Sequence, residues 1–123
     1  MKYQLLFCTC LITSVFASAQ HQISLKDAAA YAGDSVLVCG KIAGTRFFSE
    51  SADSLTLLNV GAPFPNQQLT LVIREEARKT FASPPENYYK DKQVCVYGTV
   101  TIYNGKPQIN IYKQDQIMDA VKQ

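Results

Sequence analysis

The sequence predicts an all-β domain, and the clearest evidence is a hairpin pattern between residues 92 and 112. Apolar residues alternate with other residues on both sides of Asn104-Gly105, as they do in two paired strands with one buried face. Asn-Gly is itself the strongest short hairpin signal. Further strand-like runs lie upstream, at residues 36–48, 55–60 and 69–75. We therefore expect a domain built mainly from strands.

The N-terminal segment has the three parts of a secretory signal peptide. Lys2 supplies the positive start, an apolar run extends from Leu5 to Phe16, and Ala17-Ser18-Ala19 fits the small-x-small pattern of a signal-peptidase site. The run is short for a membrane span and no charged stop-transfer segment follows it, which favours cleavage over a retained anchor. We therefore expect a signal peptide at residues 1–19 and one domain at residues 20–123 of a secreted or periplasmic protein.

The size and charge of the mature chain limit the possible folds and partners. About 104 residues remain after cleavage, enough for one small domain with a single modest core. The full chain has 12 Lys and Arg and 10 Asp and Glu, so the loss of Lys2 leaves a formal charge near +1. This is far from the basic balance of proteins that hold nucleic acid mainly through phosphate contacts. Charge alone therefore indicates no partner.

Two cysteines, Cys39 and Cys95, remain after cleavage, and an oxidising compartment permits a disulfide between them. Each lies at an odd offset before a glycine, Gly40 or Gly98, so both side chains are expected on the same side of the sheet relative to that glycine. Two alternatives stay open: a cross-strand disulfide, or two separate small apolar side chains. With a single histidine, His21, the chain has too few ligands for a structural zinc site.

The first element of the mature chain is predicted to be a short helix at Ser24–Ala32. Ser24 is a good N-cap, Asp27 lies in the capping-box position and Gly33 can end the helix. The residues expected to dock this helix on the core are Leu25, Ala28, Ala29 and Ala32.

A long strand is predicted next, from Val36 to Phe48, with Gly40 and Gly44 inside it. Glycine inside a strand usually marks a bulge or a bend, and such a bend lets one strand take part in both halves of a closed sheet. The polar segment 49–54 is expected to be a loop.

Two more strands are predicted at Leu55–Val60 and Leu69–Glu75. The two prolines in the connection 61–68 prevent it from continuing either strand. The pattern then changes to that of a helix over Glu75–Phe81, with Ala77 and Phe81 on one face.

The helix is expected to stop at Ser83-Pro84-Pro85, and a polar approach over residues 86–92 leads into the hairpin. We expect residues 116–123 to form a final helical turn or tail, with Ile117 and Val121 covering one end of the core.

The predicted order is therefore short helix, three strands, helix, two strands. This is the element order of an OB-fold, a five-stranded Greek-key barrel with a helix between strands three and four. Barrel closure pairs strands one and four, so the strands that contain Cys39 and Cys95 are expected to be neighbours.

Three segments of the chain carry further information in combination: LLNVGAPFPNQ at 57–67 followed by LTLVI, VYGTV at 96–100, and YNGKPQI at 103–109. Together they resemble small secreted bacterial OB-fold domains of the nucleic-acid-binding type, over roughly residues 25–118. The resemblance implies this fold and single-stranded nucleic acid as the ligand. Gly33-Asp34-Ser35 departs from the pattern, because such domains often have a Gly-Lys pair there, and the missing cation weakens a phosphate-binding interpretation.

No catalytic constellation emerges from the residues. A serine or cysteine nucleophile would need a histidine base, and the single histidine lies two residues past the predicted cleavage site. The adjacent Glu75 and Glu76 are interpreted as charges that stabilise a helix start. Neither a glycine-rich phosphate loop nor a metal-ligand spacing is present. We therefore expect no enzymatic activity, no cofactor and no metal.

OB-folds bind ligands on strands two and three and on the loops that join strands one to two and four to five. The planar, polar and cationic side chains at these places are the candidate ligand-binding residues: Arg46, Phe47, Phe48, Arg74, Tyr103, Asn104 and Lys106. An aromatic ring beside an arginine can stack a base or a sugar ring, so single-stranded nucleic acid or polysaccharide is the expected partner.

Structural roles stay open for several of these residues. Phe47 or Phe48 can plug the end of the barrel, Tyr103 can pack across the hairpin on Ile111, and Lys106 can be an ordinary solvated lysine. The leading hypothesis is a secreted, non-enzymatic OB-fold module that binds an extended polymer or a small ligand. The alternative is a periplasmic protein-interaction or envelope-stress module that uses the same loops against an envelope protein.

Overall fold

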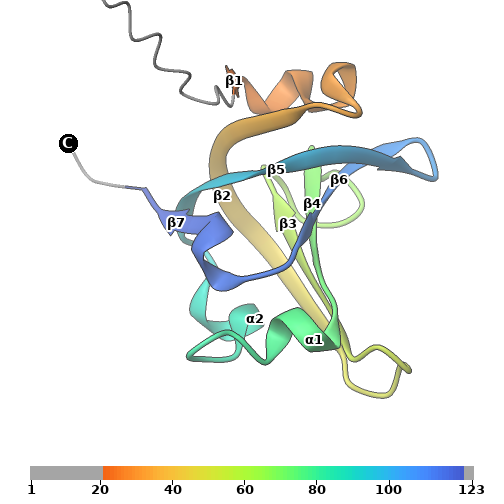
Figure 1. Ribbon diagram of the computed structural model, residues 1–123, viewed down its shortest axis with the longest axis vertical. Helices are drawn as coiled ribbons and strands as arrows, with labels where there is room; N and C mark the ends of the chain where they lie inside the picture. The colour runs from red at the N-terminus through yellow and green to blue at the C-terminus, as the bar shows by residue number, and fades with distance from the viewer. Residues whose placement is uncertain (1–20, 121–123) are drawn as a thin grey trace, which may run out of the picture.

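The computed structural model describes residues 21–120. The predicted signal peptide at residues 1–19, and Val121 at the other end, lie outside the described residues. The described residues form one sheet of seven strands with four short helical segments (Figure 1). The prediction of a mostly β protein is therefore confirmed.

The strands are β1 (His21–Ile23), β2 (Ser35–Phe48), β3 (Leu55–Val60), β4 (Leu69–Ile73), β5 (Gln93–Tyr103), β6 (Lys106–Ile111) and β7 (Ile117–Asp119). The helical segments are the 3₁₀ helices η1 (Leu25–Tyr31) and η2 (Gln114–Gln116), and the α-helices α1 (Glu75–Arg78) and α2 (Pro85–Tyr88).

Five of the strands close into a ring. β2 pairs with β3, β3 with β4, β4 with β6, β6 with β5, and β5 again with β2. All of these pairs are antiparallel except β4–β6, which is parallel. The remaining strands extend the sheet, since β1 adds to β2 in parallel and β7 adds to β5 antiparallel.

The two long strands, β2 and β5, each take part in two of the ring pairings, as predicted for β2. Residues 35–41 of β2 pair with β5 and residues 42–48 pair with β3. The register shifts between Ile42 and Gly44, so the bulge expected at a strand glycine is present. At Gly40 a Cβ atom would lie 2.7 Å from Val60 Cγ1, and at Gly98 it would lie 2.6 Å from Ile109 Cγ2. Only glycine therefore lets β2 and β5 approach their neighbours this closely.

The core fills the ring and is closed at both ends by helices. The inward-facing residues of all five ring strands are buried, among them Ile42, Leu58, Leu71, Val96 and Ile109. Ala28 of η1 covers one end, and Ala77 of α1 with Tyr89 covers the other. Figure 1 shows η1 and the pair α1 and α2 at opposite ends of the molecule.

Cys39 and Cys95 form a disulfide across the β2–β5 pair, where they lie directly opposite each other. Of the two alternatives left open by the sequence, the bridge is correct. The predicted adjacency of the strands that contain them is confirmed as well.

The N-terminal helix differs from the prediction in its period. It is a 3₁₀ helix, so residues three apart share a face. Leu25, Ala28 and Tyr31 pack on the core, while Ala29 and Ala32 are exposed, and the docking face predicted for an α-helix is wrong at these two alanines. Ser24 makes no side-chain cap bond, and instead its carbonyl accepts a backbone hydrogen bond from Asp27 at 3.0 Å.

The helix between the third and fourth ring strands is also shorter than predicted. α1 ends at Arg78, and a second short helix, α2, begins at Pro85, where the sequence indicated only a stop. Proline suits this position because the first residue of a helix needs no N–H partner. Phe81, which follows α1, still packs against the core, as predicted.

The C-terminal segment is a strand where a helical turn or tail was predicted. β7 pairs with β5 through Val96 and Ile117, because that edge of β5 is free. Ile117 is buried, as expected, but on a strand. Within residues 21–120, no helix is long and apolar enough to cross a membrane. The same residues contain no group of three or more His, Cys, Asp or Glu side chains that could hold a metal ion.

Candidate ligand-binding groove

The outer face of β3, β4 and β6 presents a row of polar side chains. Leu58, Leu71 and Ile109 point into the core, so the residues next to them point outward. The strand register aligns Asn59 with Thr70, and Thr70 with Gln108. Three neutral hydrogen-bonding side chains thus run across the sheet at one level.

Two adjoining cavities of about 360 and 350 Å³ lie over this row, and we call them together the main groove. They share Leu57, Asn59 and Phe64, which makes the surface continuous. The other residues that line the main groove are Gly44, Thr45, Arg46, Phe48, Pro63, Pro65, Gln67, Thr70, Tyr103, Asn104, Lys106 and Gln108.

The walls of the main groove are aromatic and come from one loop and the ends of two strands. Phe64, in the β3–β4 loop, is 73% exposed, and Tyr103, at the tip of the β5–β6 hairpin, is 62% exposed. Phe48 ends β2 and lies under the guanidinium of Arg46, whose Cζ is 4.7 Å from the ring centroid. Large aromatic side chains are seldom this exposed in a small soluble domain, and clusters of them are typical of binding surfaces.

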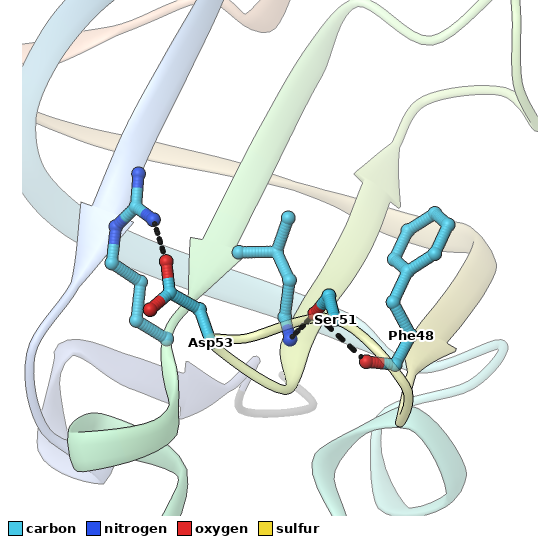
Figure 2. A network of polar contacts seen from close by, with 5 residues as sticks. Phe48, Ser51 and Asp53 are labelled. Carbon is cyan, nitrogen blue, oxygen red and sulfur yellow. Dashed lines mark hydrogen bonds and ion pairs between the residues drawn. The ribbon is translucent and has the colours of Figure 1, made fainter.

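Hydrogen bonds hold the loops that form these walls. The Lys106 ammonium donates to the Pro65 carbonyl at 3.1 Å, which ties the hairpin tip to the β3–β4 loop. In the β2–β3 loop the Ser51 hydroxyl donates to the Phe48 carbonyl at 3.0 Å and accepts from the Leu55 amide at 3.2 Å. Figure 2 shows Ser51 bridging the ends of these two strands, with Asp53 beside it. The walls are therefore positioned before any ligand arrives.

The floor of the main groove is a chain of neutral polar groups. The Gln67 amide donates to Thr70 Oγ1 at 3.2 Å, and Thr70 Oγ1 donates to Asn59 Oδ1 at 3.4 Å. Gln67 Oε1 is buried and has no hydrogen-bond partner among the described residues. Arg46 and Lys106 are the two ionised side chains in the described lining, which contains no carboxylate. The main groove is therefore aromatic and polar, with a small excess of positive charge.

The structure brings five of the seven predicted residues to the main groove: Arg46, Phe48, Tyr103, Asn104 and Lys106. Tyr103 does not lie buried across the hairpin, since most of its surface is exposed. Lys106 is held by Pro65 rather than merely solvated. Their role in binding stays a prediction.

The other two predicted residues lie elsewhere. Phe47 is half-buried at the far end of the barrel, with Arg78 Cζ 3.7 Å from its ring centroid. Arg74 pairs with Asp53 at 3.0 Å and lines a separate cavity of about 300 Å³ with Val72 and Tyr112. Phe47 and Arg74 therefore lie outside the main groove.

Sequence reasoning did not select Leu57, Asn59, Phe64, Gln67, Thr70 or Gln108 for the groove. The period-2 pattern contains a signal for some of them, since Asn59 and Thr70 are polar residues within apolar strands. For Phe64 the available signal was a large aromatic residue between two prolines in a loop.

At the end of the barrel that α1 and α2 cover, an ion pair joins these two helices. Arg78 donates to both carboxylate oxygens of Glu86, at 2.6 and 3.1 Å, and also to Thr56 Oγ1 at 2.8 Å. The hydrogen bond from Arg78 lowers the pKa of Glu86 below its ordinary value. Beside the pair, burial raises the pKa of Tyr89 to about 12. These groups are used to hold α1 and α2 under the ring.

The chain matches no protein-family model, and a comparison with curated proteins gives no match either. Solved structures do share its fold. One of them is a crystal structure from Leishmania major Friedlin described as an aspartyl-tRNA synthetase, with a TM-score of 0.50 and 9% sequence identity. The alignment covers 92% of this chain and 24% of that one, so this chain spans about a quarter of that protein. At such identity the likeness concerns the fold alone.

Proposed function

We propose that this protein is a non-enzymatic OB-fold module that binds single-stranded nucleic acid, or another extended polymer, in the main groove. The assignment to the OB-fold is supported by the pairing order of the five-stranded ring and by helices between its third and fourth strands. In that fold, β3 and β4 are strands two and three, whose outer face is a common ligand surface.

The observation that carries the proposal is the meeting of exposed aromatic rings over a neutral polar floor. Phe64 and Tyr103 offer ring faces on which bases can stack, and stacking accepts every base because each has a π face. The amide of Gln108, which is half-buried in the floor, can form hydrogen bonds with base edges. Arg46 and Lys106 supply positive charge for a phosphate backbone.

The affinity should be modest and depend weakly on salt, because only two cations line the main groove. For single strands, the slope of log K against log salt is about −0.7 per phosphate neutralised. Two such contacts give a slope of roughly −1.4.

The test is a titration of fluorescently labelled oligothymidylate with the purified protein, followed by anisotropy at low and at moderate salt. We expect a saturable rise that is larger at low salt. No change in anisotropy at low salt would exclude nucleic acid as the ligand, because counterion release favours binding most strongly there.

A protein partner is the second candidate, and the exposed apolar ring of Phe64 favours it. An envelope protein that engages the main groove should co-purify in a fixed ratio and be lost when Phe64 and Tyr103 are both replaced by alanine. This result, together with a flat DNA titration, would select the protein-interaction function over the nucleic-acid one.

We also propose that the protein is exported to the periplasm or the medium. The signal-peptide pattern of residues 1–19 supports this location. The Cys39–Cys95 disulfide is compatible with an oxidising compartment. N-terminal sequencing of the protein recovered from its host should begin at Gln20, and a start at Met1 would contradict export by cleavage.

A further inference from the structure

A second groove lies where β5 changes partners. β6 pairs with β5 as far as Val100 and Ile109, and on the other side of that point β5 pairs with β2 through Thr99 and Ser35. The continuing end of β6 therefore diverges from β5. A cavity of about 520 Å³ lies in the gap, and we call it the second groove. It shares no lining residue with the main groove.

A buried glutamine holds both walls of the second groove. Gln116 is 7% exposed, and its Oε1 accepts hydrogen bonds from the amides of Tyr112 at 2.6 Å and Lys113 at 3.2 Å. Its Nε2 donates to the Tyr97 carbonyl at 3.0 Å. One side chain thus links the end of β6 to the middle of β5, so the groove is fixed in width without a ligand.

The lining of the second groove is rich in hydroxyl groups and nearly free of charge. Ser35, Thr99 and Thr101 offer hydroxyls, Asn110 offers an amide, and Lys113 is the one ionised side chain in the described lining. Tyr112 is 71% exposed and stands at the edge of the cavity. The face of an aromatic ring carries partial negative charge, so it attracts the weakly positive hydrogens of C–H groups.

These features fit a neutral sugar chain better than a polyanion. A pyranose ring has one face of C–H groups for the tyrosine and a rim of hydroxyls that donate and accept hydrogen bonds. A phosphate backbone would find a single cation here. We propose that the second groove binds a neutral oligosaccharide, with Tyr112 as the stacking platform.

The first test is calorimetric titration of the protein with cellohexaose and with chitohexaose. We expect saturable binding that is weakened about tenfold or more by Tyr112→Ala, in line with the loss of one stacked ring. Tyr112→Phe should bind within about twofold of the original protein, because it keeps the ring. The control is Ile102→Ala, which removes a large exposed side chain that lines neither groove and should leave sugar binding unchanged.

The second test needs no substitution and therefore does not depend on a variant that folds. Addition of the hexasaccharide to ¹⁵N-labelled protein should shift the amides of Thr99, Thr101 and Lys113. The proposal is overturned if neither sugar binds at millimolar concentration, or if the shifts lie in the main groove. It is also overturned if oligothymidylate, and not sugar, shifts the amides of the second groove. A negative DNA titration leaves these outcomes unaffected, so the two proposals fail separately.

Discussion

At the scale of single residues, the main groove depends on rings that fold stability does not require. Tyr103 extends from a hairpin tip and most of its surface is exposed. We expect Tyr103→Ala to weaken oligothymidylate binding by about 1–3 kcal/mol, the usual cost of losing one stacked base. Anisotropy titrations measure the change, with Tyr112→Ala as the matched control. An equal loss in both variants would show that the effect is not specific to the groove.

Two exposed arginines, Arg46 near the end of β2 and Arg74 just after β4, allow a paired test of the charge in the groove. Arg46 lines the main groove, whereas Arg74 pairs with Asp53 outside it. We expect Arg46→Gln to make the negative slope of log K against log salt shallower by about 0.7 for single-stranded DNA. Arg74→Gln should leave the slope unchanged. A larger effect at Arg74 would place the phosphate path elsewhere.

The sequence alone does not decide which of Phe47 and Phe48 faces inward. Ile42 points into the core, so strict alternation would direct Arg46 and Phe48 inward and Phe47 outward. The bulge between Ile42 and Gly44 adds one residue to β2 and reverses this order. Gly44 predicted a bulge, but its exact register depends on β3. The sequence therefore indicated both rings as candidate binding residues, but it did not show which of them points outward.

At the scale of elements, the pair between α1 and α2 predicts a pH dependence of stability. The hydrogen bond from Arg78 lowers the pKa of folded Glu86 below 4.5. A carboxyl group with a depressed folded pKa contributes stability above its unfolded pKa and loses it as the pH falls through the folded value. We therefore expect Glu86→Gln to be less stable than the original protein at pH 7, by roughly 1–3 kcal/mol.

The difference between Glu86→Gln and the original protein should shrink as the pH falls below 4.5, because the original protein then loses the same charge. Urea denaturation at several pH values measures it. Replacement of the exposed Glu50 by glutamine is the control. A constant difference down to pH 2 would contradict the assigned role of the ion pair.

The strand glycines give a second prediction for elements. A Cβ atom at Gly98 would lie 2.6 Å from Ile109 Cγ2, within a packed core. Gly98→Ala should therefore destabilise the protein by about 1–3 kcal/mol, as overpacking usually does. Thr99→Ala, one residue along and exposed, should have a small effect on the urea midpoint. Similar midpoints for both variants would show that β5 and β6 can move apart freely.

Elements that form through their own sequence pattern were predictable, and those that form against a neighbour were not. β2 to β6 follow from alternation and from the Asn104-Gly105 turn. β7 has three residues and no usable period, and it exists because one edge of β5 accepts it. The period of η1 was missed for a similar reason, since packing of Leu25 and Tyr31 decides between 3₁₀ and α geometry.

At the scale of the whole molecule, the disulfide links the two strands that take part in both halves of the ring. Cys39 and Cys95 are 56 residues apart in sequence. Closing a loop of this length is expected to stabilise the fold by about 2–4 kcal/mol. Urea unfolding with and without reductant should differ by this amount, and alkylation with mass measurement verifies the redox state. Equal midpoints would contradict a stabilising role for the disulfide.

The ring itself follows from the order of the elements, because few topologies close five strands with one helical crossover. The groove on its surface does not follow from that order. Asn59, Thr70 and Gln108 are far apart in sequence, and they form one row only through the register of β3, β4 and β6. The sequence therefore indicates which loops meet, whereas the floor between them depends on strand alignment.

The central claim is that the main groove is where this protein holds a polymer. Chemical-shift mapping tests it most directly, with ¹⁵N-labelled protein and oligothymidylate at low salt. We predict shifts at the amides of Asn59, Phe64 and Tyr103, while Lys41 and Gln93, which pair on the β2–β5 side of the ring, stay unchanged. Shifts confined to that β2–β5 side, or none at all, would contradict the claim.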